Sequence, residues 1–283
     1  MHLFFVLPAT VVVMAVSIFP AIYAVYLSFT NRRLMWLGTM KFLGLENYSR
    51  MFNDSLFLHS LRLQFTFMAL AIPIELIIGF LVALLFLKDF PLSRLLRSLL
   101  MLPVYVLPVV SGLTWRLMLQ PEYGMLGKLF KQISLGPAAW LADVRFAFVA
   151  VVLQDVWRMW PFMFMVLYAG LTSIPNEYLE AAQLDGATPF QRLFWVIIPL
   201  IKPVIVTALL LRLIDALRIF SEVYVMTYGG PSNATMLLPL YIHRRAFEFG
   251  EIGYGSALGV FLMIVSLLIT YQLIKRSMRG ELA

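Results

Sequence analysis

Two apolar stretches of the sequence are each interrupted by a carboxylate and a guanidinium group. Asp155 and Arg158 lie in the first stretch, three residues apart. Arg212 and Asp215 lie in the second with the same spacing, which in a helix places both side chains on one face. Carboxylates accept hydrogen bonds and guanidinium forks donate them, so this set suits a ligand with vicinal hydroxyl groups. The alternative is that each pair only neutralises its own charge and binds no ligand.

Further residues extend these two faces. Phe162 shares a helix face with Asp155 and Arg158, and its ring can pack on the C–H surface of a ligand. At about 100° per residue, the charged residues of the second stretch fall within an arc of about 120°, namely Arg212, Asp215, Arg218 and Glu222. Ionisable groups inside a membrane span usually face a bundle interior or an aqueous cavity. We interpret Glu75 and Arg116 as helix-packing or interface residues and not as ligands.

The elements that position these residues are predicted to be membrane-spanning helices. Hydrophobic residues make up 61% of the 283 positions and charged residues 13%, with a mean hydropathy of +0.88, which is unusual for a soluble domain. A spanning helix needs roughly 20 mainly apolar residues. Such stretches occur at residues 3–29, 63–87, 95–119, 146–171, 203–227 and 254–274. We therefore predict an all-α, polytopic membrane protein with six transmembrane helices, forming a single transmembrane domain over residues 1–283.

Composition excludes several classes of function. The formal net charge is +7, but the 22 Lys and Arg residues form no basic run, so we expect no nucleic-acid partner. Cysteine is absent and the three histidines are dispersed, which leaves neither a thiol nucleophile nor a cluster of metal ligands. No G-x-x-x-x-G-K-[ST] sequence is present, so this chain alone does not bind ATP through a phosphate loop. We expect no catalytic residues, no metal, no cofactor in this chain and no enzymatic activity.

One connector is longer and more polar than a link between two spans needs to be. Residues 172–202 read as helix, turn and helix, and they contain Glu-Ala-Ala-Gln-Leu-Asp-Gly at 180–186, followed by Pro199. The two alanines allow close approach of a partner, Gly186 lets the chain reverse direction, and Pro199 starts the next helix. Such a helix can transmit the motion of a separate subunit to the spans as a rigid lever. The alternative is an ordinary amphipathic loop helix.

This string resembles the E-A-A-x3-G-x9-I-x-L-P signature of ABC importer permeases. Val196 replaces Ile and Ile198 replaces Leu, whereas the Glu, both Ala, the Gly and the Pro are in register. Shorter strings extend the resemblance over nearly the whole chain: G-L-E-N-Y at 44–48, W-L at 140–141, Y-G-G-P at 228–231 and A-F at 246–247. They are similar to the maltose-type permeases for carbohydrate uptake, and to the first permease of the heterodimer.

The resemblance implies a type I ABC importer permease core in the cytoplasmic (inner) membrane of a bacterium or archaeon. The implied partners are a second related permease, two copies of an ATP-binding subunit that bind ATP and Mg, an extracytoplasmic solute-binding protein, membrane lipid and a carbohydrate substrate. The connector would face the cytoplasm and couple to the ATP-binding subunit through Glu180, Ala181, Ala182, Asp185, Gly186 and Pro199. The substrate-binding positions of the family match Asp155, Arg158, Phe162, Arg212, Asp215 and Ile219. The two arginines leave room for an anionic sugar or a sugar phosphate.

Two other classes of function stay open on the sequence. An ion-coupled secondary transporter of polar solutes would use Asp155 or Asp215 to carry protons, and it would be active from this chain alone. A membrane-embedded enzyme would need a nucleophilic or metal-binding constellation, which the sequence lacks.

Overall fold

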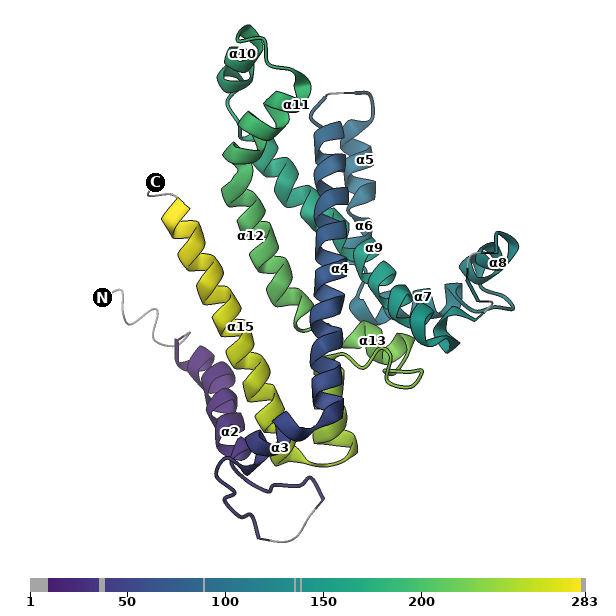
Figure 1. Cartoon of the computed structure of the whole chain (residues 1–283), viewed down its shortest axis with the longest axis vertical. Coiled ribbons are helices and arrows are strands. Elements are labelled where there is room, and N and C mark those ends of the chain that lie inside the picture. Colours follow the sequence, from purple (N-terminus) through teal and green to yellow (C-terminus); the bar gives the residue numbers. More distant parts are fainter. Residues whose placement is uncertain (1–9, 36–38, 89, 135, 138, 281–283) are drawn as a thin grey trace. The chain divides into compact units, whose positions relative to one another are not determined.

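The described residues are mainly helical, and β structure among them is limited to one isolated bridge between Thr30 and Phe42. The structure is a computed structural model that describes residues 10–35, 39–88, 90–134, 136–137 and 139–280. Figure 1 shows the helices in chain order. They are η1 (Met14–Ile18), α2 (Phe19–Ser28), α3 (Glu46–Asn53), α4 (Ser55–Leu85), α5 (Ser93–Leu100), α6 (Leu102–Tyr105), α7 (Pro108–Met118), α8 (Met125–Gln132), η2 (Trp140–Ala142), α9 (Val144–Thr172), α10 (Asn176–Leu184), α11 (Pro189–Arg192), η3 (Leu193–Ile197), α12 (Ile198–Ala216), α13 (Ser221–Met226), α14 (Leu238–His243), η4 (Arg244–Glu248) and α15 (Ile252–Gly280).

Within the described residues, five helical segments are long and apolar enough to cross a membrane. They are Thr10–Ser28, Ser55–Leu85, Val144–Thr172, Pro189–Ala216 and Ile252–Gln272. A bent pair of helices, Ser93–Tyr105 with Pro108–Met118, adds a sixth crossing if the pair is one span. The predicted all-α membrane fold is therefore confirmed. The beginning of the first predicted span, residues 3–9, lies outside the described residues.

The third predicted span, residues 95–119, is broken. Its two halves are bent by 93°. The backbone is extended at Val106 and Leu107, with ψ angles of 125° and 137°. The ring of Pro108 disfavours a helical conformation at the residue before it, and Pro108 then begins α7, where its missing N–H is not needed. The break therefore follows from the local sequence.

The fifth predicted span, residues 203–227, begins earlier than predicted. Its helix starts at Pro189 and continues through the π-helical turn η3 into α12. A capping box formed by Thr188 and Gln191 fixes this start, since each side chain accepts a hydrogen bond from a backbone N–H of the other residue. Pro199 was expected to start the next helix. It is the second residue of α12, but continuous helix precedes it from Pro189.

The same span also ends earlier than predicted. The helix ends at Ala216, and the backbone then turns, with the Arg218 N–H donating to the Asp215 carbonyl at 2.9 Å. The chain continues as the separate short helix α13, which packs closely on α7. A Cβ atom added to Gly112 would lie 2.8 Å from the Glu222 carbonyl oxygen, so only glycine permits this approach. The prediction of one polar helix face running from α12 to Glu222 is therefore wrong.

The described chain forms two compact units. The first comprises the residues up to Leu63 together with Leu237–Leu268, and the second comprises Gln64–Met236 together with the residues from Ile269 onward. In the second unit, α9 packs against α12, α6 and α7. Figure 1 shows α10 and α11 at the same end of this unit as the end of α4 and the start of α5, and α13 toward the other end.

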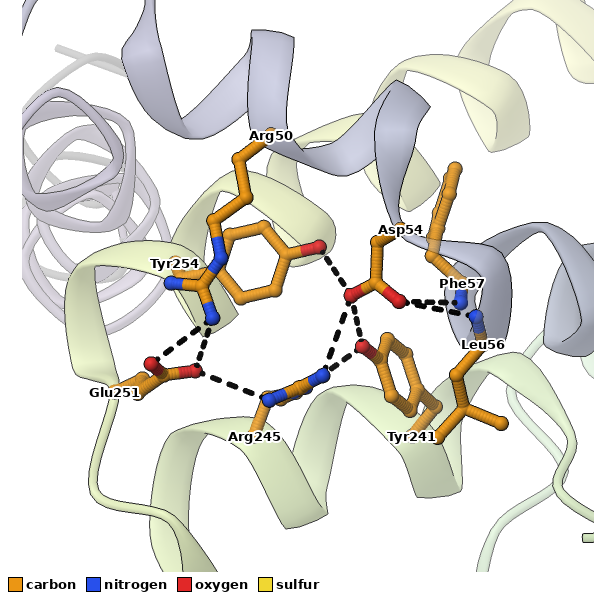
Figure 2. A network of polar contacts seen from close by, with 8 residues as sticks. All are labelled: Arg50, Asp54, Leu56, Phe57, Tyr241, Arg245, Glu251 and Tyr254. Atoms are coloured by element: carbon orange, nitrogen blue, oxygen red, sulfur yellow. Dashed lines mark hydrogen bonds and ion pairs between the residues drawn. The ribbon is translucent and has the colours of Figure 1, made fainter.

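A polar network holds the first unit together (Figure 2). Asp54 precedes α4, and its Oδ1 accepts hydrogen bonds from the Leu56 and Phe57 N–H groups at 3.0 and 3.3 Å. Its Oδ2 accepts hydrogen bonds from the hydroxyl groups of Tyr241 and Tyr254. One carboxylate therefore connects the start of α4 to α14 and α15.

Two arginines complete this network. Arg50 donates to both carboxylate oxygens of Glu251 at 3.0 Å, and its guanidinium lies 4.1 Å above the centre of the Tyr254 ring. Arg245 lies within 3.4 Å of the Asp54 carboxylate. Burial raises the pKa of Asp54, but the tyrosine and backbone hydrogen bonds and the nearby guanidinium lower it more, so the pKa lies below its ordinary value. Burial and the hydrogen bond to Asp54 raise the pKa of Tyr241 to about 12.

Candidate functional site

The second unit contains a buried cluster of charged side chains. Helix α9 contributes Asp155 and Arg158, and α12 contributes Arg212 and Asp215. Asp155 is 0% exposed and Arg212 is 1% exposed. Charged groups are buried in this way only when they are paired, because their desolvation is otherwise too unfavourable.

Arg212 lies at the centre of the cluster. Its Nε and Nη2 donate to the two carboxylate oxygens of Glu75 on α4, at 2.7 and 3.0 Å, which is a bidentate pair. Its Nη2 also donates to Asp155, and its Nη1 donates to Asp215 at 3.0 Å. One guanidinium therefore joins three carboxylates from three helices.

Arg158 connects the cluster to α13. Its Nη2 lies 3.0 Å from the Glu222 carboxylate and 3.9 Å from Asp155 Oδ1. The second distance is an ion pair without a hydrogen bond. The turn after Ala216 allows Glu222, which is 3% exposed, to return to α9.

The structure brings four of the six predicted substrate-binding residues into this cluster, namely Asp155, Arg158, Arg212 and Asp215. Phe162 is half-buried on α9 and Ile219 is buried in the turn after α12, and neither contributes a polar group to the cluster. Arg218 lies exposed and forms no ion pair with any residue that the structure describes.

Sequence reasoning did not place two members of the cluster. Glu75 forms an interhelical pair, which agrees with its interpretation as a packing residue, but its partner Arg212 could not be named. Glu222 was expected on the α12 face and instead pairs with Arg158. The sequence offered one indication of a buried ion pair, which is that Glu75 is the only acidic residue of its predicted span.

The connector at residues 172–202 forms a helix, a tight turn and a second helix. Helix α10 ends in a Schellman motif, in which the Ala187 N–H donates to the Ala182 carbonyl and the Gly186 N–H donates to the Gln183 carbonyl, at 3.0 and 3.1 Å. Gly186 has a φ of +76°, the left-handed conformation that this motif needs. Glycine at this position therefore permits the reversal of the chain.

Four of the six predicted coupling residues line one groove of about 620 Å³ in this connector, namely Ala181, Ala182, Asp185 and Pro199. Glu180 and Gly186 are exposed beside it. Large apolar side chains are also exposed in and around the connector. Tyr178 is 54% exposed, Phe190 75% and Trp195 80%. Isolated apolar residues are common on protein surfaces, but a group of aromatic residues on one short segment is typical of an interaction surface.

No group of three or more His, Cys, Asp or Glu side chains is arranged to hold a metal ion within the described part of the chain.

Comparison with known proteins identifies the family. Residues 63–280 match the profile described as "Binding-protein-dependent transport system inner membrane component". The trehalose/maltose transport system permease protein MalF of Thermococcus litoralis is 34% identical, over 97% of this chain and 93% of the relative. The trehalose transport system permease protein SugA of Mycobacterium tuberculosis is also 34% identical, over 95% of this chain and 86% of the relative.

A solved structure shares the fold. It is a chain of a bacterial ABC transporter involved in the import of the acidic polysaccharide alginate, with a TM-score of 0.83, 20% sequence identity, and coverage of 98% of this chain and 95% of that chain. The family profile spans more than half of the sequence, and the relatives align over nearly all of it. The chain therefore belongs to the family of inner membrane components of binding-protein-dependent transport systems.

Proposed function

We propose that this chain is the permease subunit of an ATP-driven importer that translocates a sugar or polyol-like solute delivered by an extracytoplasmic binding protein. The family match over residues 63–280 carries the proposal. Relatives named for trehalose and maltose, or for trehalose, support the class of solute. The whole chain acts as one transmembrane permease domain, with both termini in the cytoplasm.

The energy source is a separate subunit. This chain has no phosphate-loop sequence. In the proposed importer, two copies of a separate ATP-binding subunit bind ATP and Mg. A second related permease completes the membrane part of the importer. The chain itself catalyses no reaction.

The connector at residues 172–202 couples this chain to the ATP-binding subunit. Its exposed aromatic side chains and its groove supply a surface that a partner can cover. The Schellman motif at the end of α10 gives the connector a defined shape. Helix runs from Pro189 through α12 without a loop, so a displacement of the connector is passed directly to the span that carries Arg212 and Asp215.

The charged cluster and the neighbouring Phe162 and Ile219 form the solute path. Ionisable groups in spans usually face a cavity or a bundle interior, and four of those in the cluster come from the two spans on either side of the connector. Carboxylate and guanidinium groups can exchange hydrogen bonds with hydroxyl groups of a sugar.

Purification of the affinity-tagged chain in mild detergent tests the proposed assembly. We expect a second permease and an ATP-binding subunit to co-purify with it, and ATP hydrolysis by this complex to rise when the loaded binding protein is added. If the chain purifies without these subunits and transports a solute by itself, the proposal is wrong.

Substitution at Gly186 tests the coupling role of the connector. A Cβ at this position would meet no atom within 4 Å, so the effect of Gly186→Val comes from the backbone and not from a clash. A β-branched residue in the left-handed conformation is unfavourable by roughly 1–2 kcal/mol. We expect Gly186→Val to reach the membrane but to lose uptake. The matched control Gly186→Asn tolerates this conformation and keeps most of the activity. Uptake by Gly186→Val that equals uptake by the unchanged protein would remove the coupling role.

A further inference from the structure

The guanidinium of Arg212 has little capacity left for a solute. An arginine carries five N–H donors. In this structure its Nε, Nη1 and Nη2 atoms all donate to carboxylates, from Glu75, Asp155 and Asp215. These four bonds leave one N–H group, on Nη1, so an anionic group that binds Arg212 in a bidentate manner would have to displace one of these carboxylates, two of which belong to fully buried residues.

Carboxyl groups outnumber guanidinium groups in the cluster. Two arginines, Arg158 and Arg212, face four acids, namely Glu75, Asp155, Asp215 and Glu222. Glu75, Asp155 and Glu222 are buried beside the two arginines, so the buried part of the cluster has no guanidinium group to spare for an anion. The exposed charged side chain of the cluster is the Asp215 carboxylate, although the sequence alone suggested room for an anion beside two arginines.

Two carboxylate oxygen atoms of the cluster accept no hydrogen bond from the described residues, one on an exposed side chain and one on a buried side chain. The Asp215 side chain is 52% exposed, and only its Oδ2 is bonded to Arg212. An exposed carboxylate in a spanning helix usually faces an aqueous cavity. Asp155 Oδ1 is buried without a hydrogen-bond partner and lies 3.9 Å from Arg158 Nη2. Both atoms can accept hydrogen bonds, so they suit a hydroxyl or an ammonium group and repel a carboxylate, sulfonate or phosphate.

We propose that the solute path beside α9 and α12 is electronegative, and that Asp215 is the residue through which it favours neutral or cationic polyhydroxylated solutes over anionic ones. Asp215 makes the direct contact, while Glu75 and Asp155 act as positioning residues that hold Arg212. This inference rests on the proposed function, because it defines the class of solute that the proposed importer carries.

The test uses charged thiol reagents as small ionic probes of the path. The chain contains no cysteine, so Leu211→Cys introduces its only thiol. Leu211 is 48% exposed and lies four residues before Asp215 on α12. The purified importer complex is treated with a cationic or an anionic methanethiosulfonate reagent. Mass spectrometry of this chain measures the rate at which each reagent modifies the introduced thiol.

We expect the cationic reagent to react faster, and Asp215→Asn to reduce the ratio of the two rates. Side chains four residues apart in a helix are about 6 Å apart. At that distance, with an effective dielectric constant of about 40, a unit charge changes the local concentration of a monovalent ion about tenfold. Thr207→Cys is the matched control, because it lies on the same helix about 12 Å along the axis from Asp215 and its ratio should change little.

Two results would overturn the inference. One is a modification rate by the cationic reagent that is equal to or lower than the rate by the anionic reagent in the complex that carries Leu211→Cys alone. The other is no reaction with either reagent in the assembled importer, because Asp215 would then face lipid or protein instead of a water-filled path. Failure of the proposed function gives a different pattern, in which the rate ratio is as expected but no ATP-dependent uptake of any sugar is found.

Discussion

Removal of Arg212 should destabilise the protein more than any other single change in the charged cluster. Arg212→Met deletes the guanidinium that pairs with Glu75, Asp155 and Asp215. The first two carboxylates are 0% exposed, so they would remain buried with little or no compensation. Removing one partner of a buried ion pair typically destabilises a protein by roughly 3–5 kcal/mol. At about 2 °C per kcal/mol for a chain of this size, the melting temperature should fall by roughly 6–10 °C.

The assay is thermal unfolding of the purified chain in mild detergent, followed by circular dichroism. Asp215→Asn is the matched control, because Asp215 pairs with the same guanidinium but its side chain is 52% exposed. It should reduce stability by less than about 1 kcal/mol. The double substitution Arg212→Met with Glu75→Met should cost less than the sum of the single changes, since it removes both partners of the bidentate pair. Equal melting temperatures for Arg212→Met and Asp215→Asn would refute this reasoning.

Three further predictions concern packing, pH and topology. Gly112→Leu should lower the melting temperature markedly, because even a Cβ at this position would lie within 2.9 Å of the Glu222 backbone; a melting temperature equal to the wild type would exclude this close contact. The folded pKa of Asp54 lies below its unfolded value, so its contribution to stability is present above about pH 4 and is lost as the pH falls through the lowered pKa. Melting curves should therefore show a steeper loss of stability below about pH 4 in the wild type than in Asp54→Asn, and parallel curves would show that this carboxylate is not stabilising. Reporter fusions at Ala283 and after Tyr228 should report cytoplasm and exterior, respectively, and identical reports would require another number of spans.

The membrane spans could be predicted from the sequence because each is encoded by a continuous run of apolar residues. An apolar run of sufficient length identifies a span wherever it packs, and the pairs Asp155 with Arg158 and Arg212 with Asp215 follow from helical spacing alone. The helix, turn and helix of the connector also follow from local sequence, since Gly186 permits the reversal that ends α10.

The ends of the fifth span were not predictable in the same way. Residues 217–226 are mostly apolar and include Leu217, Ile219, Val223 and Val225. Hydrophobicity alone therefore cannot separate the end of α12 from the short helix α13, which packs on α7 through Gly112. At the other end, the capping box at Thr188 was a readable signal, because the sequence Thr-Pro-Phe-Gln has the spacing of a helix start.

The membership of the charged cluster depends on contacts between helices. Glu75 and Arg212 are 137 residues apart in the sequence and 2.7 Å apart in the structure. Opposite charge in two spans is compatible with such a pair, but a single sequence does not show which helices are neighbours. The excess of carboxylates around the two arginines became visible only when the partners of each guanidinium were known.

Solute uptake by reconstituted proteoliposomes tests the central claim most directly. The complete importer, with the second permease and the ATP-binding subunits, is reconstituted and supplied with its binding protein, and uptake of radiolabelled trehalose and maltose is measured. The proposed function predicts uptake that requires both ATP and the binding protein, and that persists when ionophores collapse the ion gradients. Uptake that needs neither ATP nor a partner subunit, and that stops when the ion gradients are collapsed, would contradict it and would identify the chain as an ion-coupled transporter.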